Sequence, residues 1–246
     1  MTCPSKDGGS LHPRLAIGAV LVAAGAGSRL GGRPKPLLEL GGVSLIRHQL
    51  MALLGAGVDV VVVVLGHHAA AIEAVVAESA VAASTTVAST TVASVAAAAL
   101  VEFPVTLAHN PAPDDGLASS VLTGLRALGG TLDAVIVALA DQPLIQREDI
   151  VALIGAYQQR GGADMVVPRV AGEPGNPVML SAALRVEWLA GDTEASGRRW
   201  RDAHRDRVAW FDTGNEHYRL DIDTPEDLER FQARTGHALR WPVGLE

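Results

Sequence analysis

The stretch "VLVAAGAGSRLGGRPKPLLELGG", residues 20–42, decides the interpretation of the fold. An apolar segment runs into a glycine-rich turn, which carries Arg29 and then Lys35 between two prolines. A strand that ends in such a turn is typical of a phosphate-binding loop, because glycines let backbone N–H groups approach anionic oxygens closely. Several kinds of loop share this property, and the spacing of the residues discriminates among them.

Two common phosphate-binding loops do not match the stretch. The mononucleotide loop G-x-x-x-x-G-K-[S/T] needs Ser or Thr directly after the lysine, whereas Pro36 follows Lys35. The dinucleotide fingerprint G-x-G-x-x-G starts correctly but has Leu30 at its sixth position. That fingerprint also needs an acid at the end of the second strand, where this chain has "LGHH" at 65–68.

The remaining features predict a site for a nucleoside triphosphate. Arg29 can bind phosphate oxygens with its fork of donors. Pro34 and Pro36 exclude a regular helix around Lys35 and predict an extended backbone that aims one ammonium at one phosphate. We therefore expect Arg29 and the amides of residues 25–28 to hold the β- and γ-phosphates, and Lys35 to contact the reacting phosphate.

Outward from the loop, short β-branched runs alternate with segments of helical length. Several runs are apolar throughout, as in strands covered on both faces, so the order predicts a three-layer α/β fold with a mostly parallel sheet and helices on both faces. The expected strands are 16–24, 58–66, 105–110, 133–141, 163–168, 177–181 and 208–213. The expected helices are 43–55, 69–80, 117–128, 147–160, 182–190, 194–204 and 225–234.

The composition narrows the classes of partner. The 246 residues are 48% hydrophobic, which suits a large packed core, and the formal charge of -7 with 4% aromatic residues disfavours nucleic acid. The one cysteine, Cys3, allows no disulfide within the chain. No apolar run reaches the roughly 20 residues of a membrane helix. We expect a cytoplasmic protein with no nucleic-acid or membrane partner.

The chain reads as one domain over residues 15–246, preceded by a flexible segment over residues 1–14. The run "STTVASTTVAS" at 84–94 is of low complexity, with alanine-rich flanks. Residues 84–99 are therefore expected to form a surface insertion, to which we assign no function, because long surface insertions cost little.

Two acidic residues follow predicted strands. The run "DAVIVALADQPLI" places Asp141 just after a buried strand, and "YRLDIDTPEDLERF" places Asp223 just before a helix. Helix capping accounts for Thr224 and Pro225 but not for Asp223. A lone acid such as Asp141 is often only a helix cap. Because Mg²⁺ takes carboxylates together with substrate phosphates, both acids are also candidate metal ligands.

Two further segments have features of a binding site. In "NPAPDDGLASSVLTGLRAL", residues 110–128, Gly116 permits a close approach, and Ser119 and Ser120 offer hydroxyls near a helix start, although ordinary capping also explains them. The run "VPRVAGEPGNPVMLS", residues 167–181, contains a turn that leads into a strand. That turn consists of Gly175, Asn176 and Pro177.

Together these segments resemble the MobA-like NTP transferases, which are nucleotidyltransferases with a GT-A-like, Rossmann-like fold. The opening stretch resembles the signature L-A-A-G-x-x-x-R-[MFL]-G-x-x-K, and the acidic segments resemble L-x-D-x-P and D-[IV]-D-T-P-E-D-[LV]. The resemblance implies that Asp141 and Asp223 bind Mg²⁺ and that Lys35, Arg29 and Asp141 are catalytic. It implies that the nucleotide is bound by Leu21, Ala23, Ala24, Gly25, Gly27, Ser28, Arg29, Lys35, Gly66, Asn110, Gly116, Leu117, Ser119 and Ser120. It implies that the acceptor is bound by Gly175, Asn176 and Pro177.

The resemblance also favours one branch of the family. Guanylyltransferases read L-A-G-G in the first motif and G-P-L-A-G in the second, whereas this chain has Ala23 and Ala24 before Gly25, and "GLASSV". The implied activity is transfer of CMP from CTP to the phosphate of molybdopterin or molybdenum cofactor, with a molybdenum hydroxylase as a further partner.

Several alternatives stay open at this stage. One is a guanylyltransferase, or another nucleotidyltransferase of the same fold that acts on a different phosphorylated acceptor. A second is a GT-A glycosyltransferase with a D-x-D metal motif, although "DID" at 221–223 does not follow a central strand and Lys35 would then have no role. A third is a non-catalytic molybdenum cofactor chaperone. A role as an oxidoreductase, a label that some family members carry, is disfavoured because the sequence shows no flavin or nicotinamide motif.

Overall fold

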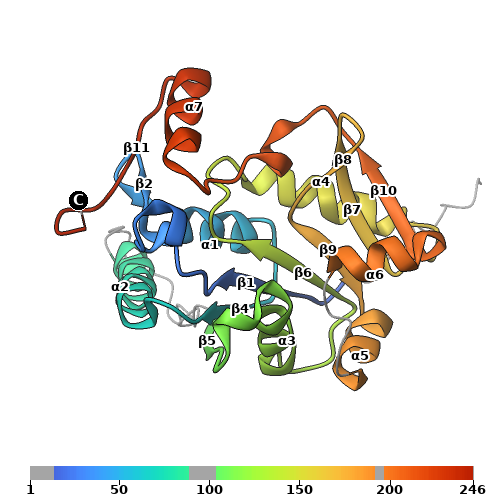
Figure 1. Ribbon diagram of the computed structural model, residues 1–246. Helices are drawn as coiled ribbons and strands as arrows, with labels where there is room; N and C mark the ends of the chain where they lie inside the picture. Colours follow the sequence, from blue (N-terminus) through green and yellow to red (C-terminus); the bar gives the residue numbers. More distant parts are fainter. Residues whose placement is uncertain (1–13, 89–103, 192–196, 246) are drawn as a thin grey trace, which may run out of the picture.

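The computed structural model describes residues 14–88, 104–191 and 197–245. The described chain forms a main sheet of eight strands and a small sheet of three (Figure 1). The expected flexible segment lies outside the described residues, except for Arg14. Of the expected insertion, residues 84–88 end a helix and the rest lies outside the described residues.

The main sheet is mixed and mostly parallel, which confirms the predicted fold class. Its order is β10-β7-β9-β6-β1-β4-β5, with β8 paired to β7. Only β8 and β9 run antiparallel to their neighbours. The strands are β1 (Ile17–Ala23), β4 (Val60–Leu65), β5 (Val105–His109), β6 (Ala134–Leu139), β7 (Met165–Val170), β8 (Glu173–Pro174), β9 (Val178–Ser181) and β10 (Val208–Asp212).

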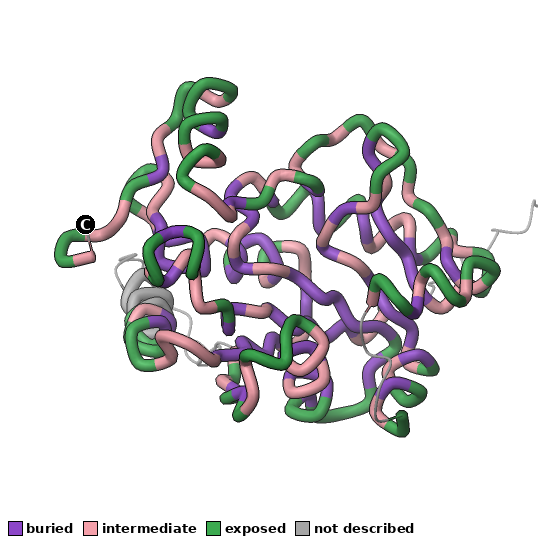
Figure 2. Tube along the Cα trace, in the orientation of Figure 1, coloured by how far each residue is buried: buried purple, intermediate pink, exposed green. Residues whose placement is uncertain are grey.

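The central strands are apolar throughout because both of their faces are covered. One face packs against α1, α2 and α4, and the opposite face packs against α3, α5 and α6. Figure 2 shows the buried residues concentrated along the strands between these two layers. The helices are α1 (Leu45–Gly55), α2 (Ala69–Ala88), α3 (Leu117–Ala127), α4 (Arg147–Gln158), α5 (Ala182–Ala190) and α6 (Gly197–Ala203). None of the described helices has the length and apolar character needed to span a bilayer.

A small second sheet lies beside the opening loop and was not predicted from the sequence. It consists of β2 (Glu39–Leu40), β3 (Val43–Ser44) and β11 (Leu239–Arg240), in the order β11-β2-β3. Helix α7 (Pro225–Thr235) packs through Phe231 against an apolar cluster that also contains Leu38 of the opening stretch and Leu239 of β11. The end of the opening stretch is therefore tied to the C-terminal segment.

The order of the strands defines where a ligand can bind. From β1 the chain builds β4 and β5 on one side, and it then returns to build β6 on the other side of β1. In an open α/β sheet, such a reversal opens a crevice beyond the carboxyl ends of the two strands. The opening loop follows β1 and Asp141 follows β6, so both segments border this crevice.

Candidate active site

The glycine turn after β1 has the conformation that a phosphate-binding loop needs. Gly27 has φ 64° and begins a single 3-10 turn, Ser28–Leu30. A side chain at Gly27 would place its Cβ 1.9 Å from the carbonyl oxygen of Arg33, so only glycine fits. Within the described chain, the N–H groups of residues 25–27 have no hydrogen-bond partner. They are available to an anion.

The prediction of an extended backbone at Lys35 is wrong. Residues Lys35–Leu37 form a 3-10 turn that follows Pro34, and Pro36 occupies the first turn of that short helix. Proline is tolerated there because the first N–H groups of a helix have no intrahelical partner. Pro34 itself is extended, as expected, with ψ 94°. The two prolines therefore fix the start of a turn, and Lys35 stands at its beginning.

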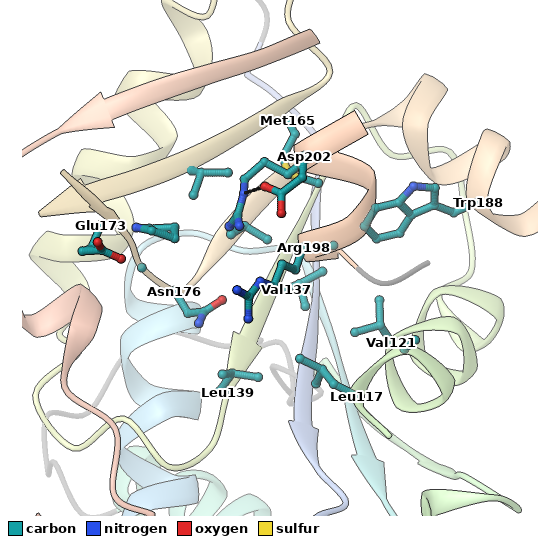
Figure 3. Close-up of a pocket in the computed structure, with 17 residues that line it drawn as sticks. Leu117, Val121, Val137, Leu139, Met165, Glu173, Asn176, Trp188, Arg198 and Asp202 are labelled. Carbon is teal, nitrogen blue, oxygen red and sulfur yellow. Dashed lines mark hydrogen bonds and ion pairs between the residues drawn. The ribbon is translucent and has the colours of Figure 1, made fainter. Parts of the chain in front are cut away.

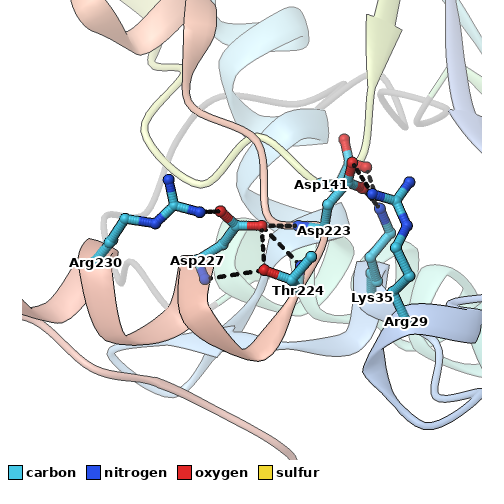
Figure 4. A network of polar contacts seen from close by, with 7 residues as sticks. All are labelled: Arg29, Lys35, Asp141, Asp223, Thr224, Asp227 and Arg230. Carbon is cyan, nitrogen blue, oxygen red and sulfur yellow. Dashed lines mark hydrogen bonds and ion pairs between the residues drawn. The ribbon is translucent and has the colours of Figure 1, made fainter.

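Lys35 joins the two predicted acids (Figure 4). Its Nζ donates to Oδ2 of Asp141 at 2.6 Å and to Oδ1 of Asp223 at 2.6 Å. The guanidinium of Arg29 lies 3.3 Å from Oδ2 of Asp223. The side chains of Lys35 and Asp141 are 15% and 20% exposed, so the pair is largely shielded from solvent. Three segments that are far apart in the sequence thus meet at one point of the crevice.

Helix capping and one backbone bond place Asp223. Thr224 is the N-cap of α7, and Asp227 accepts from the N–H groups of Asp223 and Thr224 (Figure 4). The N–H of Ile222 donates to the carbonyl oxygen of Asp141 at 3.1 Å. The predicted cap at Thr224 is therefore correct, and the cap also holds Asp223 against Asp141.

The carboxylates of the site shift the pKa values of their neighbours. Burial alone would lower the pKa of Lys35, but the negative charges and hydrogen bonds of Asp141 and Asp223 outweigh it and raise the pKa. Lys35 therefore keeps its positive charge at neutral pH. Desolvation and the carboxylates of Asp141 and Asp223 raise the pKa of the neighbouring Asp221. Among the described residues, the site thus holds the three carboxyl groups of residues 141, 221 and 223 but only two cationic side chains, Lys35 and Arg29.

The same carboxylates fit a divalent cation. Oδ1 of Asp141 is buried and has no hydrogen-bond partner among the described residues. The other oxygen of Asp141 and one oxygen of Asp223 converge on Lys35 Nζ. Mg²⁺ needs only one or two carboxylates when substrate phosphates and water complete its shell. No group of three or more His, Cys, Asp or Glu side chains with metal-binding geometry occurs in the described residues, so a bound cation would depend on the substrate for ligands.

The predicted nucleotide-binding residues Asn110, Ser119 and Ser120 lie close together, and hydrogen bonds within the segment 110–120 hold them there. Nδ2 of Asn110 donates to Ser120 Oγ at 3.0 Å, and Oδ1 accepts from Ser119 Oγ at 3.0 Å. The N–H of Asn110 donates to the carbonyl of Leu65 at the end of β4. This network positions Gly116 and the start of α3 beside the crevice. It also shows that the two hydroxyls are already engaged within the loop.

Three small or apolar residues of the predicted nucleotide site have a packing reason to be there. Leu21 and Ala23 lie in β1 and are buried. A Cβ on Gly66 would lie 2.8 Å from the carbonyl oxygen of Ala24 and 2.8 Å from Cβ of Pro113. Gly66 therefore lets the ends of β1 and β4 and the 110–120 segment approach one another closely.

The turn at 175–177 is linked to the Asp141 segment through Gln142, the residue that follows Asp141. The N–H of Asn176 donates to the carbonyl of Tyr218 at 2.8 Å. The side chain of Gln142 donates to the carbonyls of both Asn176 and Tyr218 at 3.2 Å. Gln142 is 2% exposed, and our sequence analysis gave it no role. A polar residue directly after a predicted metal ligand was the only available signal. The 176–177 peptide bond, which precedes Pro177, is cis.

Comparison with known proteins gives a consistent family. Residues 19–208 match the family model described as the MobA-like NTP transferase domain. The bifunctional enzyme IspD/IspF of Clavibacter michiganensis is 35% identical over 171 residues, which are 68% of this chain and 36% of that protein. The chain thus corresponds to about a third of that relative's length.

Two further similarities extend over nearly whole chains. Nicotine blue oxidoreductase of Paenarthrobacter nicotinovorans is 29% identical over 222 residues, which cover 87% of this chain and 95% of that protein. The solved structure of a nucleotidyl transferase from a Methanothermobacter species has a TM-score of 0.65 and 26% identity, and the match covers 89% of this chain and 96% of that one. Both matches therefore span most of this chain and nearly all of the other protein.

Proposed function

Because the chain belongs to the MobA-like NTP transferase family, it is a nucleotidyltransferase, and we propose that it transfers CMP from CTP to the phosphate of a molybdopterin-type cofactor. The observation that carries the proposal is the convergence of Lys35, Asp141 and Asp223 at the crevice between β1 and β6. These residues combine a shielded cation with two carboxylates, which is what a reaction between two phosphate groups needs.

Each residue of the site has a separate role in the proposed transfer of CMP. An oxygen of the acceptor phosphate bonds to the α-phosphorus of CTP, and the bond to the β-phosphate breaks, so pyrophosphate leaves. The acceptor phosphate is itself the nucleophile, so the protein needs no general base. Lys35 stabilises the charge that develops on the α-phosphate, and Arg29 with the amides of residues 25–27 holds the leaving pyrophosphate. Asp141 and Asp223 would hold Mg²⁺, which would supply further charge neutralisation when bound.

The choice of CTP and of the acceptor rests on the sequence motifs. Ala23 and Ala24 stand where guanylyltransferases have the central Ala-Gly of L-A-G-G, and "GLASSV" replaces G-P-L-A-G. We propose that a molybdenum hydroxylase receives the product. The alternatives are GTP as donor, a different phosphorylated acceptor, or a chaperone role without transfer.

A radiolabel assay tests the proposal. The protein is incubated with Mg²⁺, molybdenum cofactor and α-³²P-labelled CTP or GTP, and products are separated by chromatography. We expect labelled cofactor from CTP, with loss in Asp141→Asn and retention in the exposed control Asp206→Asn. Equal or greater incorporation from GTP would contradict the cytidine assignment. Binding of cofactor without any transfer would support the chaperone, and hydride transfer in place of CMP transfer would support the oxidoreductase name of the Paenarthrobacter relative.

A further inference from the structure

Two carbonyl groups of the opening loop are held by residues 66–68, the segment that follows β4. The N–H of His67 donates to the carbonyl oxygen of Ala24 at 3.2 Å. Nε2 of His68 lies 3.2 Å from the carbonyl oxygen of Ala26. A carbonyl oxygen only accepts hydrogen bonds, so Nε2 of His68 is the donor and carries the proton. No role could be assigned to either histidine from the sequence.

These two bonds fix the direction of the N–H group that follows each carbonyl. The peptide bonds after Ala24 and Ala26 are trans. In a planar trans peptide, the C=O and N–H groups point in opposite directions. The N–H groups of Gly25 and Gly27 therefore point away from the 66–68 segment.

The order of the strands determines which side of the loop those N–H groups face. Strand β1 lies between β4 and β6 in the main sheet. The 66–68 segment follows β4, and Asp141 follows β6. N–H groups that point away from the 66–68 segment therefore face the side of Asp141 and Lys35, where the proposed function places the phosphates. Within the described residues, neither of these N–H groups has a hydrogen-bond partner.

The backbone of His68 has an unusual conformation. Its φ is 60°, in the left-handed region that residues other than glycine seldom adopt. Its carbonyl oxygen accepts from the N–H groups of Ala71 and Ile72, so His68 begins α2. Backbone strain of this kind persists where surrounding contacts hold it, and it is common at functional sites. One residue thus ties the first turn of α2 to the opening loop.

We propose that His68 is a positioning residue for the nucleotide, and that it acts by holding the carbonyl of Ala26 so that the N–H of Gly27 faces the β- and γ-phosphates. The inference rests on the proposed function, which assigns those phosphates to the opening loop. The bond from Nε2 is the one hydrogen bond to this carbonyl within the described residues. Without it, the peptide before Gly27 can rotate, because glycine accepts many backbone conformations. The carbonyl oxygen would then face the phosphates and repel them.

The test measures whether His68 acts on the β- and γ-phosphates. Calorimetric titration with Mg²⁺ compares the binding of CTP, of inorganic pyrophosphate and of CMP, which lacks those two phosphates. His68→Leu and His68→Gly remove the donor, and glycine adopts φ 60° without steric cost. In His68→Gln, the amide nitrogen takes the place of Nε2. His67→Leu is the matched control, because it removes the neighbouring imidazole, which contacts Asp114, and keeps the N–H that holds Ala24.

We expect His68→Leu and His68→Gly to weaken the binding of CTP and pyrophosphate about tenfold and that of CMP less than about twofold, because a hydrogen bond to a charged group is lost. His68→Gln should bind CTP more tightly than His68→Leu does. An equal loss for CTP and CMP indicates a merely structural role and overturns the inference. The same change in the ratio of CTP to CMP affinity in His67→Leu also overturns it. Circular dichroism checks folding, and His68→Gly decides the matter if His68→Leu unfolds.

Binding of the acceptor gives a second readout. The turn at 175–177 borders a cavity of about 580 Å³, and Figure 3 shows Asn176 among the side chains that line it. None of the described residues that line this cavity belongs to the opening loop or to the 66–68 segment. In the transfer assay, the His68 variants should therefore raise the KM for CTP and leave the KM for the acceptor unchanged. An equal rise in both KM values contradicts the inference.

The outcomes separate this inference from the proposed function. If the wild-type protein binds CTP and pyrophosphate through His68 but transfers no CMP to molybdenum cofactor, the proposed function is wrong while the role of His68 stands. If transfer occurs and the His68 variants bind CTP and CMP as the wild type does, the function stands and the inference is wrong. If GTP proves to be the donor, the comparison of GTP with GMP decides the inference, because the opening loop is proposed to contact phosphates and not the base.

Discussion

Replacing Gln142 by leucine removes the buried link between the acid after β6 and the turn at 175–177. Its side-chain amide donates at 3.2 Å to the carbonyls of Asn176 and Tyr218. The carbonyl of Tyr218 keeps the N–H of Asn176 as a donor, so the larger loss falls on the carbonyl of Asn176. One buried acceptor left unpaired costs about 1–3 kcal/mol, and the second bond contributes about 1 kcal/mol. We expect Gln142→Leu to lower the free energy of unfolding by about 2–4 kcal/mol.

Gln142→Glu gives the same prediction a signature in pH. Glutamate has the shape of glutamine, but its carboxylate would face two carbonyl oxygens in a site that is 2% exposed. Both effects raise the folded-state pKa of the new carboxyl above the unfolded value of about 4.3. The variant should therefore match the wild type best below that value, and its deficit should grow as the pH rises through the folded pKa.

The assay is urea unfolding of wild type and variants at several pH values between 4.5 and 8. Gln232→Glu is the matched control, because it makes the same change at an exposed position of α7. A deficit for Gln142→Glu that stays constant with pH, or a cost of Gln142→Leu no larger than that of the control, would refute the reasoning. In the transfer assay we expect the KM for the acceptor to rise more than the KM for CTP, because Gln142 holds the turn at 175–177, which we propose binds the acceptor.

Three further outcomes follow from other contacts. Gly124→Ala should destabilise the protein by about 1–3 kcal/mol in thermal or urea unfolding, because its Cβ would lie 2.3 Å from Val20 between α3 and the sheet, whereas Gly129→Ala, with open space around it, should not. Lys35→Met should lower kcat by about 100- to 1,000-fold, and calorimetry should show tighter binding of Mn²⁺ to the nucleotide-free protein, because the ammonium no longer occupies the two carboxylates. Burial would raise the pKa of Asp164, but hydrogen bonds from Ser181 and Arg207 outweigh it and lower the pKa. The resulting stability is present above the unfolded pKa and is lost as the pH falls through the folded one, so Asp164→Asn should reduce the loss of stability measured by acid titration.

The sequence predicted the main sheet and its helices well because these elements follow simple periodic patterns. Strand β4 is a run of valines, and the other long strands are also rich in β-branched residues. Such runs are typical of strands that are buried on both faces. The small sheet was missed because β2, β3 and β11 are two residues long each, too short for any period to show. The direction of β9 was also out of reach, since pairing depends on contacts that are distant in the sequence.

The arrangement of the site residues could be predicted only in part, for a similar reason. Motif spacing identified Lys35, Asp141 and Asp223, and the structure brings them into one cluster. It could not show that Ser119 and Ser120 are engaged in hydrogen bonds with Asn110.

The span between Lys35 and its partners has a consequence for biosynthesis. The lysine and Asp223 are 188 residues apart, and β2 pairs with β11 at positions 239–240. Lys35 thus acquires its second carboxylate only after 188 further residues have been synthesised. A product interrupted directly after β10 has all the strands of the main sheet, yet lacks Asp223 and therefore one of the two carboxylates at the lysine. Assembly of the reaction centre therefore follows the synthesis of every strand of the main sheet.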